Sequence, residues 1–256
     1  MAKDMLSVVY IVKNGGKLFS QSLAAVQTYA NEIIVVDNGS TDTSALIARR
    51  AGAHVYKHNS SSESVLRTYA LSKAHSDWIL FLDHDEIVST ALGNELIKLI
   101  LANTSKNAYV IPYRNHLFGK ELNYAGETYS MLRFFKKKSV YVTEKRVHAT
   151  FQSNKTLGIT KNKLDHYSYN SLLQILIKFT NYAKRDAREK YNKHETVTLR
   201  KLLMHGPHLF WVRFIKEYGY KDGLQRIMLD LCFAYMECAT YAFLYYLYIR
   251  KKYAQK

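Results

Sequence analysis

Cysteine and proline are scarce in this chain of 256 residues, and each shortage narrows the class of protein. The two cysteines, Cys232 and Cys238, lie six residues apart on a predicted helix, where their side chains point in different directions and are not expected to pair. The sequence therefore excludes a disulfide framework and a cysteine-based metal site, and it fits a reducing cytosol. With two prolines, no low-complexity linker and 48% hydrophobic residues, the chain is expected to build a sizeable core.

Acidic residues are also few. The chain has 21 Asp and Glu against 37 Lys and Arg, which gives a formal net charge of +16. Such a charge favours anionic partners: phosphorylated substrates, acidic lipid headgroups or nucleic acid. No nucleic-acid-binding module is recognisable, so we expect no nucleic-acid partner. The apolar run at residues 5–12 is short and lacks a small-residue cleavage site, so it predicts a strand rather than a signal peptide, and a cytoplasmic protein.

The order of apolar segments predicts an α/β fold. Strand-like runs alternate with helical spacing in the first hundred residues, which is typical of a mostly parallel sheet flanked by helices. The predicted strands are 6–12, 32–37, 53–57 and 77–82, and the predicted helices are 17–30, a short one carrying Leu46 and Ile47, 62–75 and 89–102. Later strands at 109–113 and 130–135 indicate a mixed sheet, and a helix is predicted at 171–192. From Gly223 onward, apolar residues at alternating steps of four and three predict one long amphipathic helix, with an apolar series of Leu224, Met228, Leu231, Tyr235, Cys238, Ala242, Tyr245 and Ile249.

The most informative segment is W-I-L-F-L-D-H-D-E at residues 78–86, an apolar strand that ends in Asp83 and Asp85. Carboxylates beside a buried strand are costly unless a cation or hydrogen bonds compensate them. A hard divalent cation that carries a diphosphate would do so with few protein ligands. The earlier strands end in Val12 and Asn14 and in Asp37, at the same edge of a parallel sheet, which predicts a nucleotide site. The alternative for residues 37–40 is a tight turn with a helix cap.

These segments carry a family resemblance. V-V-D-N-G-S-T-D at residues 35–42, Arg67 with Ala70 and Ala74, and the 78–86 segment together resemble a family 2 glycosyltransferase of GT-A fold. The later part is similar to the subfamily that builds lipopolysaccharide core sugars, through residues 132–135, 147–148, 164–172, 178–183 and 219–223. The resemblance implies a GT-A (Rossmann-like) domain over 1–170, with a nucleotide-binding half (1–104) and an acceptor-side half (105–170), and a helical C-terminal region over 171–256.

The resemblance also assigns roles to residues. Asp37 would contact the uracil or an equivalent base, and Arg67 would lie beside the nucleotide. Asp83 would face the ribose and the metal, Asp85 would ligate the metal, and His166 would be a late metal ligand. The implied cofactor is Mn²⁺ or Mg²⁺. The alternative for His166 is a structural histidine bonded to the backbone.

The sequence departs from the subfamily at two points. After the first strand it reads Asn14-Gly15-Gly16 where the subfamily has N-E or N-E-E, and it reads Val147-His148-Ala149 where the subfamily has V-H-E. That glutamate fits the place of the general base, which an inverting transfer needs to take the proton of the acceptor hydroxyl. Alanine cannot take it, so the candidates are His148, Glu144 or Glu127; otherwise the activity is weak or lost.

The resemblance predicts a metal-dependent hexosyltransferase that moves a sugar, with inversion, from a nucleoside-diphosphate sugar, UDP-linked, to a hydroxyl of a glycan or lipid-linked acceptor. The pathway would be cell-envelope or lipopolysaccharide biosynthesis. One alternative is a sugar-phosphate nucleotidyltransferase, of whose glycine-rich loop residues 14–17 are a faint echo. The other is a basic membrane- or polyanion-binding protein with a vestigial nucleotide site.

The C-terminal helix has two readings of its own. Residues 228–249 are long enough to cross a bilayer, but Asp230 and Glu237 lie inside that run. The helix either packs against the rest of the protein or lies on anionic lipid with the help of residues 250–252, R-K-K. The second reading predicts a peripheral protein on the inner face of the cytoplasmic membrane.

Overall fold

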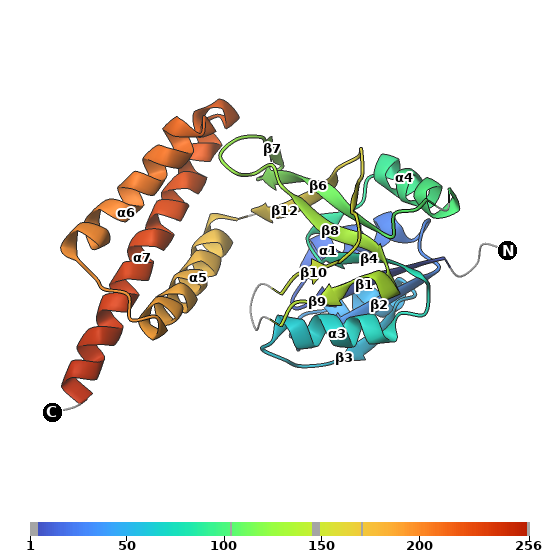
Figure 1. Cartoon of the computed structure of the whole chain (residues 1–256), viewed down its shortest axis with the longest axis horizontal. Coiled ribbons are helices and arrows are strands. Elements are labelled where there is room, and N and C mark those ends of the chain that lie inside the picture. Colours follow the sequence, from blue (N-terminus) through green and yellow to red (C-terminus); the bar gives the residue numbers. More distant parts are fainter. Residues whose placement is uncertain (1–4, 103, 145–148, 170, 255–256) are drawn as a thin grey trace. The chain divides into compact units, whose positions relative to one another are not determined.

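The computed structural model describes residues 5–102, 104–144, 149–169 and 171–254. The chain forms two compact units (Figure 1). The α/β unit comprises residues 1–114 and 129–167, and the helical unit comprises residues 115–128 and 168–256.

A mixed sheet organises the α/β unit. Its strands lie in the order β3-β2-β1-β4-β8-β6-β12-β5, with β11 paired to β6. β7 pairs with residues 115–117 at the end of β6, which belong with it to the helical unit. The parallel strands are β1 (Leu6–Val12), β2 (Glu32–Asp37), β3 (His54–Lys57) and β4 (Trp78–Asp83). The others are β5 (Glu86–Ile87), β6 (Ala108–Leu117), β7 (Lys120–Leu122), β8 (Ser130–Lys136), β11 (Gly158–Ile159) and β12 (Leu164–Tyr169). A separate antiparallel pair joins β9 (Tyr141–Val142) to β10 (Phe151–Gln152).

Helices cover both faces of the parallel strands. Alternate residues of a strand point to opposite faces, so Val8 and Tyr10 pack with α1 and α4 while Val9 packs with α3. Both faces of β1 are buried, which explains its continuous apolar sequence. The helices of this unit are α1 (Gly16–Val26), α2 (Ser44–Arg50), α3 (Glu63–Lys73), α4 (Thr90–Leu101) and the 3-10 turn η1 (Lys137–Ser139). The predicted GT-A-like layering is confirmed.

The helical unit is built around one long helix. α7 (Leu224–Ala254) packs against α5 (Leu172–Asn192) and α6 (Leu199–Trp211). The π-helical turn η2 (Val212–Lys216) continues α6, and the 3-10 turn η3 (Gly219–Asp222) leads into α7. Its apolar core includes Phe179 of α5 and Leu229 of α7. Both cysteines are free, as predicted.

The structure confirms a long helix from residue 224 but corrects its buried face. The predicted apolar series includes Leu224 and Leu231, which are 84% and 54% exposed, whereas Arg226 and Asp230 are fully buried. Among the described residues, Leu224–Lys251 is the one stretch long and apolar enough to cross a membrane, judged by length and composition only, and 39% of its apolar window is buried within the structure.

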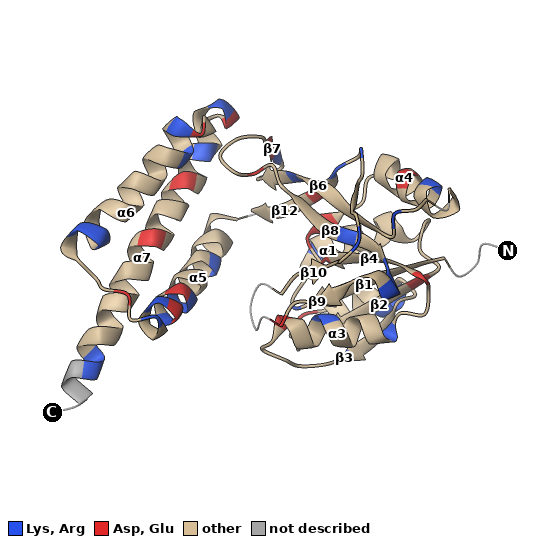
Figure 2. Ribbon diagram, viewed as in Figure 1, with Lys and Arg blue, Asp and Glu red and all other residues tan. Residues whose placement is uncertain are grey.

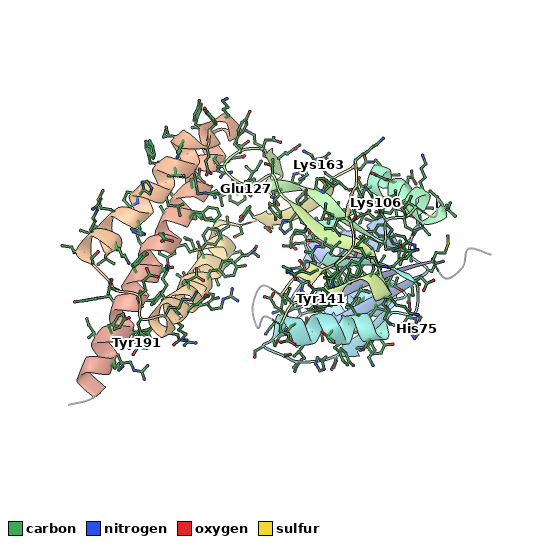
Figure 3. All side chains as sticks on the ribbon, viewed as in Figure 1. His75, Lys106, Glu127, Tyr141, Lys163 and Tyr191 are labelled. Carbon is green, nitrogen blue, oxygen red and sulfur yellow. The ribbon has the colours of Figure 1, made fainter. Side chains whose placement is uncertain are left out.

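Buried charges tie residues 115–128 to α7 within the helical unit. Arg226 Nε donates to Asp230 Oδ2 at 2.9 Å, and its Nη2 donates to the carbonyl oxygen of Ala125 at 3.2 Å. Arg213 Nη2 donates to Glu127 Oε1 at 2.9 Å (Glu127 is labelled in Figure 3). Because each of these charges has a partner of opposite sign, their burial is tolerated.

Candidate functional site

The carboxyl ends of three strands meet at one edge of the sheet. β1 pairs in parallel with both β2 and β4, with Val12 opposite Asp37 and Ile11 opposite Asp83. Asp37 and Asp83 therefore flank the end of β1, one on each side. The structure thus brings together the strand ends that the sequence singled out, at the kind of edge where open α/β sheets bind ligands.

Two loops after these strands are hydrogen-bonded to each other. Asn14 Oδ1 accepts from the backbone N–H of Thr41 at 2.8 Å, and the Asn14 N–H donates to Ser40 Oγ at 3.0 Å. Asn14 has a φ of 56°, in the left-handed region that asparagine tolerates better than most residues. The buried Asp37 accepts from the N–H of Ser40 at 2.9 Å through Oδ1, which makes the tight turn of the alternative reading.

Asp37 also lines a pocket, so it can contact a ligand in addition to holding the turn. This pocket, ≈ 330 Å³, is lined by Asp37, Gly39, Ser40, Lys57, His58 and Asn59. A neighbouring pocket of ≈ 420 Å³ shares Gly39 and Asn59 with it and adds Lys13. The Asp37 carboxylate can accept hydrogen bonds from the N–H and hydroxyl groups of a nucleoside, and Lys13 and Lys57 can bind a phosphate through their positive charge.

A buried arginine organises the carboxylates at the end of β4. Arg133 on β8 donates through Nη2 to Asp83 Oδ2 and, at 2.6 Å, to Glu86 Oε1, and through Nε to the hydroxyl of Tyr113 at 2.6 Å. Burial raises the pKa of Asp83, but the charges of Arg133 and Arg67 outweigh it and hold that pKa below its ordinary value. Burial raises the pKa of Glu86 above its ordinary value even though Arg133 opposes the rise.

His166 lies beside the second carboxylate of the motif. β12 pairs with β5 so that His166 stands opposite Glu86, and the N–H of Tyr167 donates to the carbonyl oxygen of Asp85 at 2.9 Å. His166 Nε2 is 3.6 Å from Asp85 Oδ2. Burial lowers the pKa of His166, but Asp85, Glu86 and Asp83 outweigh it and raise the pKa above its ordinary value. The structure therefore joins His166 to the acidic cluster.

Arg67 presents a buried donor without a partner. Its guanidinium, on α3, lies over the rings of Phe81 and Phe151 at 5.0 and 5.2 Å, and its Nε is buried and makes no hydrogen bond within the described part of the chain. Arg67 and Arg133 both line a pocket of ≈ 170 Å³. Burial lowers the pKa of Arg67, although the charge of Asp83 opposes that shift. An anionic group in this pocket would satisfy the orphaned donor.

The side chains at this site fit some, but not all, of the ligand positions of a hard divalent cation. Two ligands on one Mg²⁺ or Mn²⁺ ion stand about 3–4 Å apart, which the separation of Asp85 Oδ2 and His166 Nε2 satisfies. Asp83 is engaged by Arg133, and the described residues contain no group of three or more His, Cys, Asp or Glu placed to hold a metal. A cation here would need phosphate oxygens or waters as its remaining ligands, as Mg²⁺ commonly does.

The three candidates for the general base differ in exposure and in the partners that they already have. Glu144 is exposed, and His148 falls outside the described residues. Ala149 is buried, so no carboxylate stands at that position. Glu127 is buried in the helical unit and engaged by Arg213, which leaves its carboxylate already committed.

Three residues of the site were missed from the sequence: Arg133, Glu86 and Tyr113. The sequence signal for Arg133 is a single basic residue inside an apolar strand, since a buried charge implies a buried partner.

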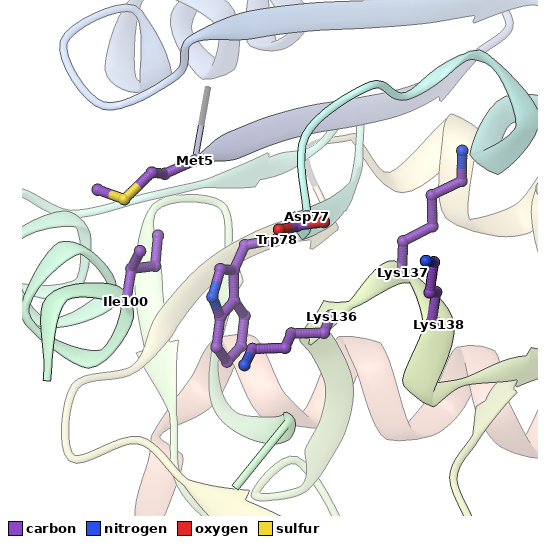
Figure 4. A pocket seen from close by; sticks show the side chains of 7 residues that line it. All are labelled: Met5, Asp77, Trp78, Ile100, Lys136, Lys137 and Lys138. Carbon is purple, nitrogen blue, oxygen red and sulfur yellow. The ribbon is translucent and has the colours of Figure 1, made fainter. Parts of the chain in front are cut away.

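A basic pocket of ≈ 300 Å³ lies elsewhere (Figure 4). It is lined by Met5, Asp77, Trp78, Ile100 and Lys136 to Lys138. Met5 precedes β1 and Trp78 begins β4, so this pocket lies at the amino ends of the strands, opposite the candidate site.

The chain has recognisable relatives. An uncharacterized glycosyltransferase of Rickettsia bellii (strain RML369-C) is 32% identical over 105 residues, which cover 41% of this chain and 35% of that protein. The chain spans about a third of the length of the curated relatives it matches.

A solved structure shares the architecture over most of the chain. Residues 1–349 of S. aureus TarS superpose with a TM-score of 0.50 at 14% identity, over 93% of this chain and 91% of that one, which shows the shared fold alone. A Mycobacterium tuberculosis glucosyl-3-phosphoglycerate synthase, crystallised with Mn²⁺, UDP and glucosyl-3-phosphoglycerate, covers 46% of each chain with a TM-score of 0.36 at 21% identity, too weak to bear on this chain's ligands.

The family model "Glycosyl transferase family 2" matches residues 7–166, a span that contains both sheet-edge loops, the acidic pair after β4 and His166. Since this match covers more than half of the chain, the protein belongs to glycosyltransferase family 2.

Proposed function

We propose that the chain transfers a sugar, with inversion, from a UDP-linked sugar to a hydroxyl of a glycan or lipid-linked acceptor, with Mn²⁺ or Mg²⁺ as cofactor. The observation that carries the proposal is the convergence of Asp37, Asp83 and Asp85 on one sheet edge, together with the buried Arg67 Nε, which has no hydrogen-bond partner within the described residues. Carboxylates for a nucleoside and a cation, next to a donor for a phosphate, are what a nucleoside-diphosphate sugar requires.

Each residue then has a distinct task. Asp37, with Val12 and Asn14 at the neighbouring strand end, accepts from the base or the ribose, and Arg67 donates to a phosphate oxygen. Asp85 and His166 would hold the cation, while Arg133 fixes Asp83 towards the ribose side. When bound, the cation would neutralise charge on the departing diphosphate, which is where negative charge develops.

On the acceptor side, the transfer needs a general base. Inverting transfer requires a group that takes the acceptor proton, and we assign this role to Glu144 or His148, the carboxylate and the histidine nearest in sequence to Ala149. The buried Ala149 specifically favours one rival function, a polyanion-binding protein with a vestigial nucleotide site. Release of free nucleotide from a nucleotide sugar in the presence of Mn²⁺ would separate an enzyme from that rival.

The biological setting is proposed on the same basis. The segments similar to lipopolysaccharide core enzymes support cell-envelope or lipopolysaccharide biosynthesis, with residues 1–170 as the catalytic domain. The positive charge supports a cytoplasmic protein that is peripheral to the inner face of the cytoplasmic membrane.

The test is calorimetric titration with UDP in Mn²⁺ or in chelator. Asp85→Ala should abolish the metal-dependent part of UDP binding, because it removes a cation ligand without touching the core. Asp77→Ala, an exposed aspartate at the opposite ends of the strands, is the matched control and should bind UDP as the natural protein does. Equal UDP affinity in Mn²⁺ and in chelator would contradict the metal assignment.

A further inference from the structure

An apolar ridge runs along the exposed side of α6 and η2. Leu199, Leu203, Pro207, Trp211 and Ile215 follow one another at intervals of four residues, and all five are exposed. Leu203 is 58% and Trp211 51% exposed. Residues four apart lie on neighbouring turns of one helix face, so these side chains form a continuous surface rather than scattered exposures.

The other side of α6 is committed to the core of the helical unit. A Cβ on Gly206 would stand 2.3 Å from Cys238 Sγ and 2.7 Å from the carbonyl oxygen of Ala234, so the α6 and α7 backbones approach closely there. The ridge therefore faces away from α7, and α6 cannot rotate to bury it without losing that contact.

The exposed charges near the ridge are mostly basic. Residues 196–216 contain no Asp or Glu, but Lys201 pairs with Glu195 at 3.2 Å, Arg213 pairs with Glu127 at 2.9 Å, and the exposed Glu217 follows directly after Lys216. Figure 2 shows Lys and Arg near the two ends of this helical run. Arg200 and Lys216 are exposed and stand at opposite ends of the ridge. A partner that is apolar within and negative at its surface therefore matches this face.

We propose that the ridge of α6 and η2 is a membrane-docking surface that lies flat on an anionic bilayer. The apolar side chains enter the boundary between headgroups and acyl chains, Trp211 sits at the headgroup level, and the exposed Arg200 and Lys216 contact acidic headgroups. α6 has 13 residues, fewer than the roughly 20 needed to cross a bilayer, so it docks rather than spans. The surface does not depend on sugar transfer, and it moves the expected lipid contact from α7 to α6.

Trp211 is a built-in reporter for the test. The chain has two tryptophans, and the other, Trp78, is buried in the α/β unit. The fluorescence of the full chain minus that of Trp211→Phe isolates the signal of Trp211 without disturbing the core. With vesicles of phosphatidylcholine and phosphatidylglycerol this signal should shift to the blue and be quenched by brominated acyl chains. It should not change with pure phosphatidylcholine, because the acidic headgroups are then missing.

Matched variants locate the surface. Leu203→Gln combined with Ile215→Gln should reduce co-sedimentation with the anionic vesicles at least tenfold. Leu231→Gln, an equally exposed leucine on α7, should leave it unchanged. Circular dichroism before and after each change establishes that the helices persist. Loss of binding in Leu231→Gln but not in the double variant would overturn the proposal in favour of α7.

One further outcome would overturn it in favour of a second copy of this chain. If the ridge is a dimer interface, light scattering without lipid should show a dimer that the double variant converts to a monomer. The proposal expects the chain to remain monomeric in both forms and UDP binding to be the same in both, which keeps this test separate from that of the catalytic site.

Discussion

At the scale of single residues, Arg133 explains how three acidic side chains can share one buried strand end. Burial by itself lowers the pKa of a guanidinium, but Asp83, Glu86 and Tyr113 raise the pKa of Arg133 well above its ordinary value. The arginine thus stays charged and anchors Asp83 and Glu86, while Asp85 pairs with His166. This division leaves Asp85 and His166 as the pair best placed to receive a cation.

A half-buried carboxylate, Glu32, gives a prediction about pH. Glu32 accepts from the hydroxyl of Ser7 and, at 3.2 Å, from the N–H of Ser76, and it lies 3.0 Å from the ring of His75 (labelled in Figure 3). Burial raises the pKa of Glu32, but these hydrogen bonds outweigh it and lower the pKa below its ordinary value of 4.5. The folded state therefore gains stability from Glu32 above pH 4.5 and loses it as the pH falls through the lower folded-state pKa.

We expect Glu32→Gln to reduce the free energy of unfolding by about 1 kcal/mol at pH 7, the difference between charged and neutral hydrogen bonds. In urea titrations this deficit should shrink as the pH falls below 4.5. The exposed Glu217→Gln is the control and should show no deficit. A deficit for Glu32→Gln that does not change with pH would mean that the charge of Glu32 does not stabilise the fold.

Residues that directly follow a strand could be located from the sequence, whereas contacts between residues far apart in the sequence could not. Asp37, Asp83 and Asp85 could be located because a polar residue directly after an apolar strand is a local signal. Arg133 and Glu86 are 47 residues apart, and their contact depends on the antiparallel packing of β8 against β4, which no local pattern encodes. His166 was placed by resemblance alone, and β12 brings it to Asp85.

At the scale of elements, predictability follows burial. The strands β1, β2 and β4 were predicted nearly to the residue because both of their faces are buried. The two-residue strands β5, β9, β10 and β11 are too short to carry a periodic signal. α6 was missed because Gly206 and Pro207 interrupt its centre and because much of its apolar surface faces outward.

The contact between α6 and α7 gives a prediction of its own. Gly206→Ala should destabilise the protein by about 1–3 kcal/mol despite the better helix propensity of alanine, since the new methyl group would overlap Cys238 Sγ and the Ala234 carbonyl oxygen. Chemical denaturation measures the loss. Adding Cys238→Ala should recover only part of it, because the backbone oxygen cannot move aside. Full recovery would show that the helices are not held as close as the structure has them.

At the scale of the whole molecule, the two units each carry one tryptophan, Trp78 in the α/β unit and Trp211 in the helical unit. Unfolding followed in Trp211→Phe reports the α/β unit, and the difference from the unmodified chain reports the helical unit. This arrangement allows the stability of each unit to be measured within the full chain.

We expect Arg226→Met to lower the unfolding free energy of the helical unit by about 3–5 kcal/mol, because it leaves Asp230 and Asp222 buried with fewer compensating charges. The α/β transition and UDP binding should stay unchanged. Lys193→Met, which breaks an exposed pair with Glu189, is the control and should cost less than about 0.5 kcal/mol. Equal shifts of both transitions in Arg226→Met would show that the units unfold together.

The ties between residues 115–128 and Arg226 bear on how the protein is made. Tyr124 and Ala125 accept hydrogen bonds from a side chain 102 and 101 residues later in the sequence. At a synthesis rate of about 5–20 residues per second, that interval lasts roughly 5–20 s. During this time β6 and β8, the strands on either side of the loop, have been synthesised. α7, which carries the loop's hydrogen-bond donor Arg226, has not. On the ribosome, Tyr124 and Ala125 therefore emerge before their native partner exists, and a helix translated much later completes a part of the chain made long before it.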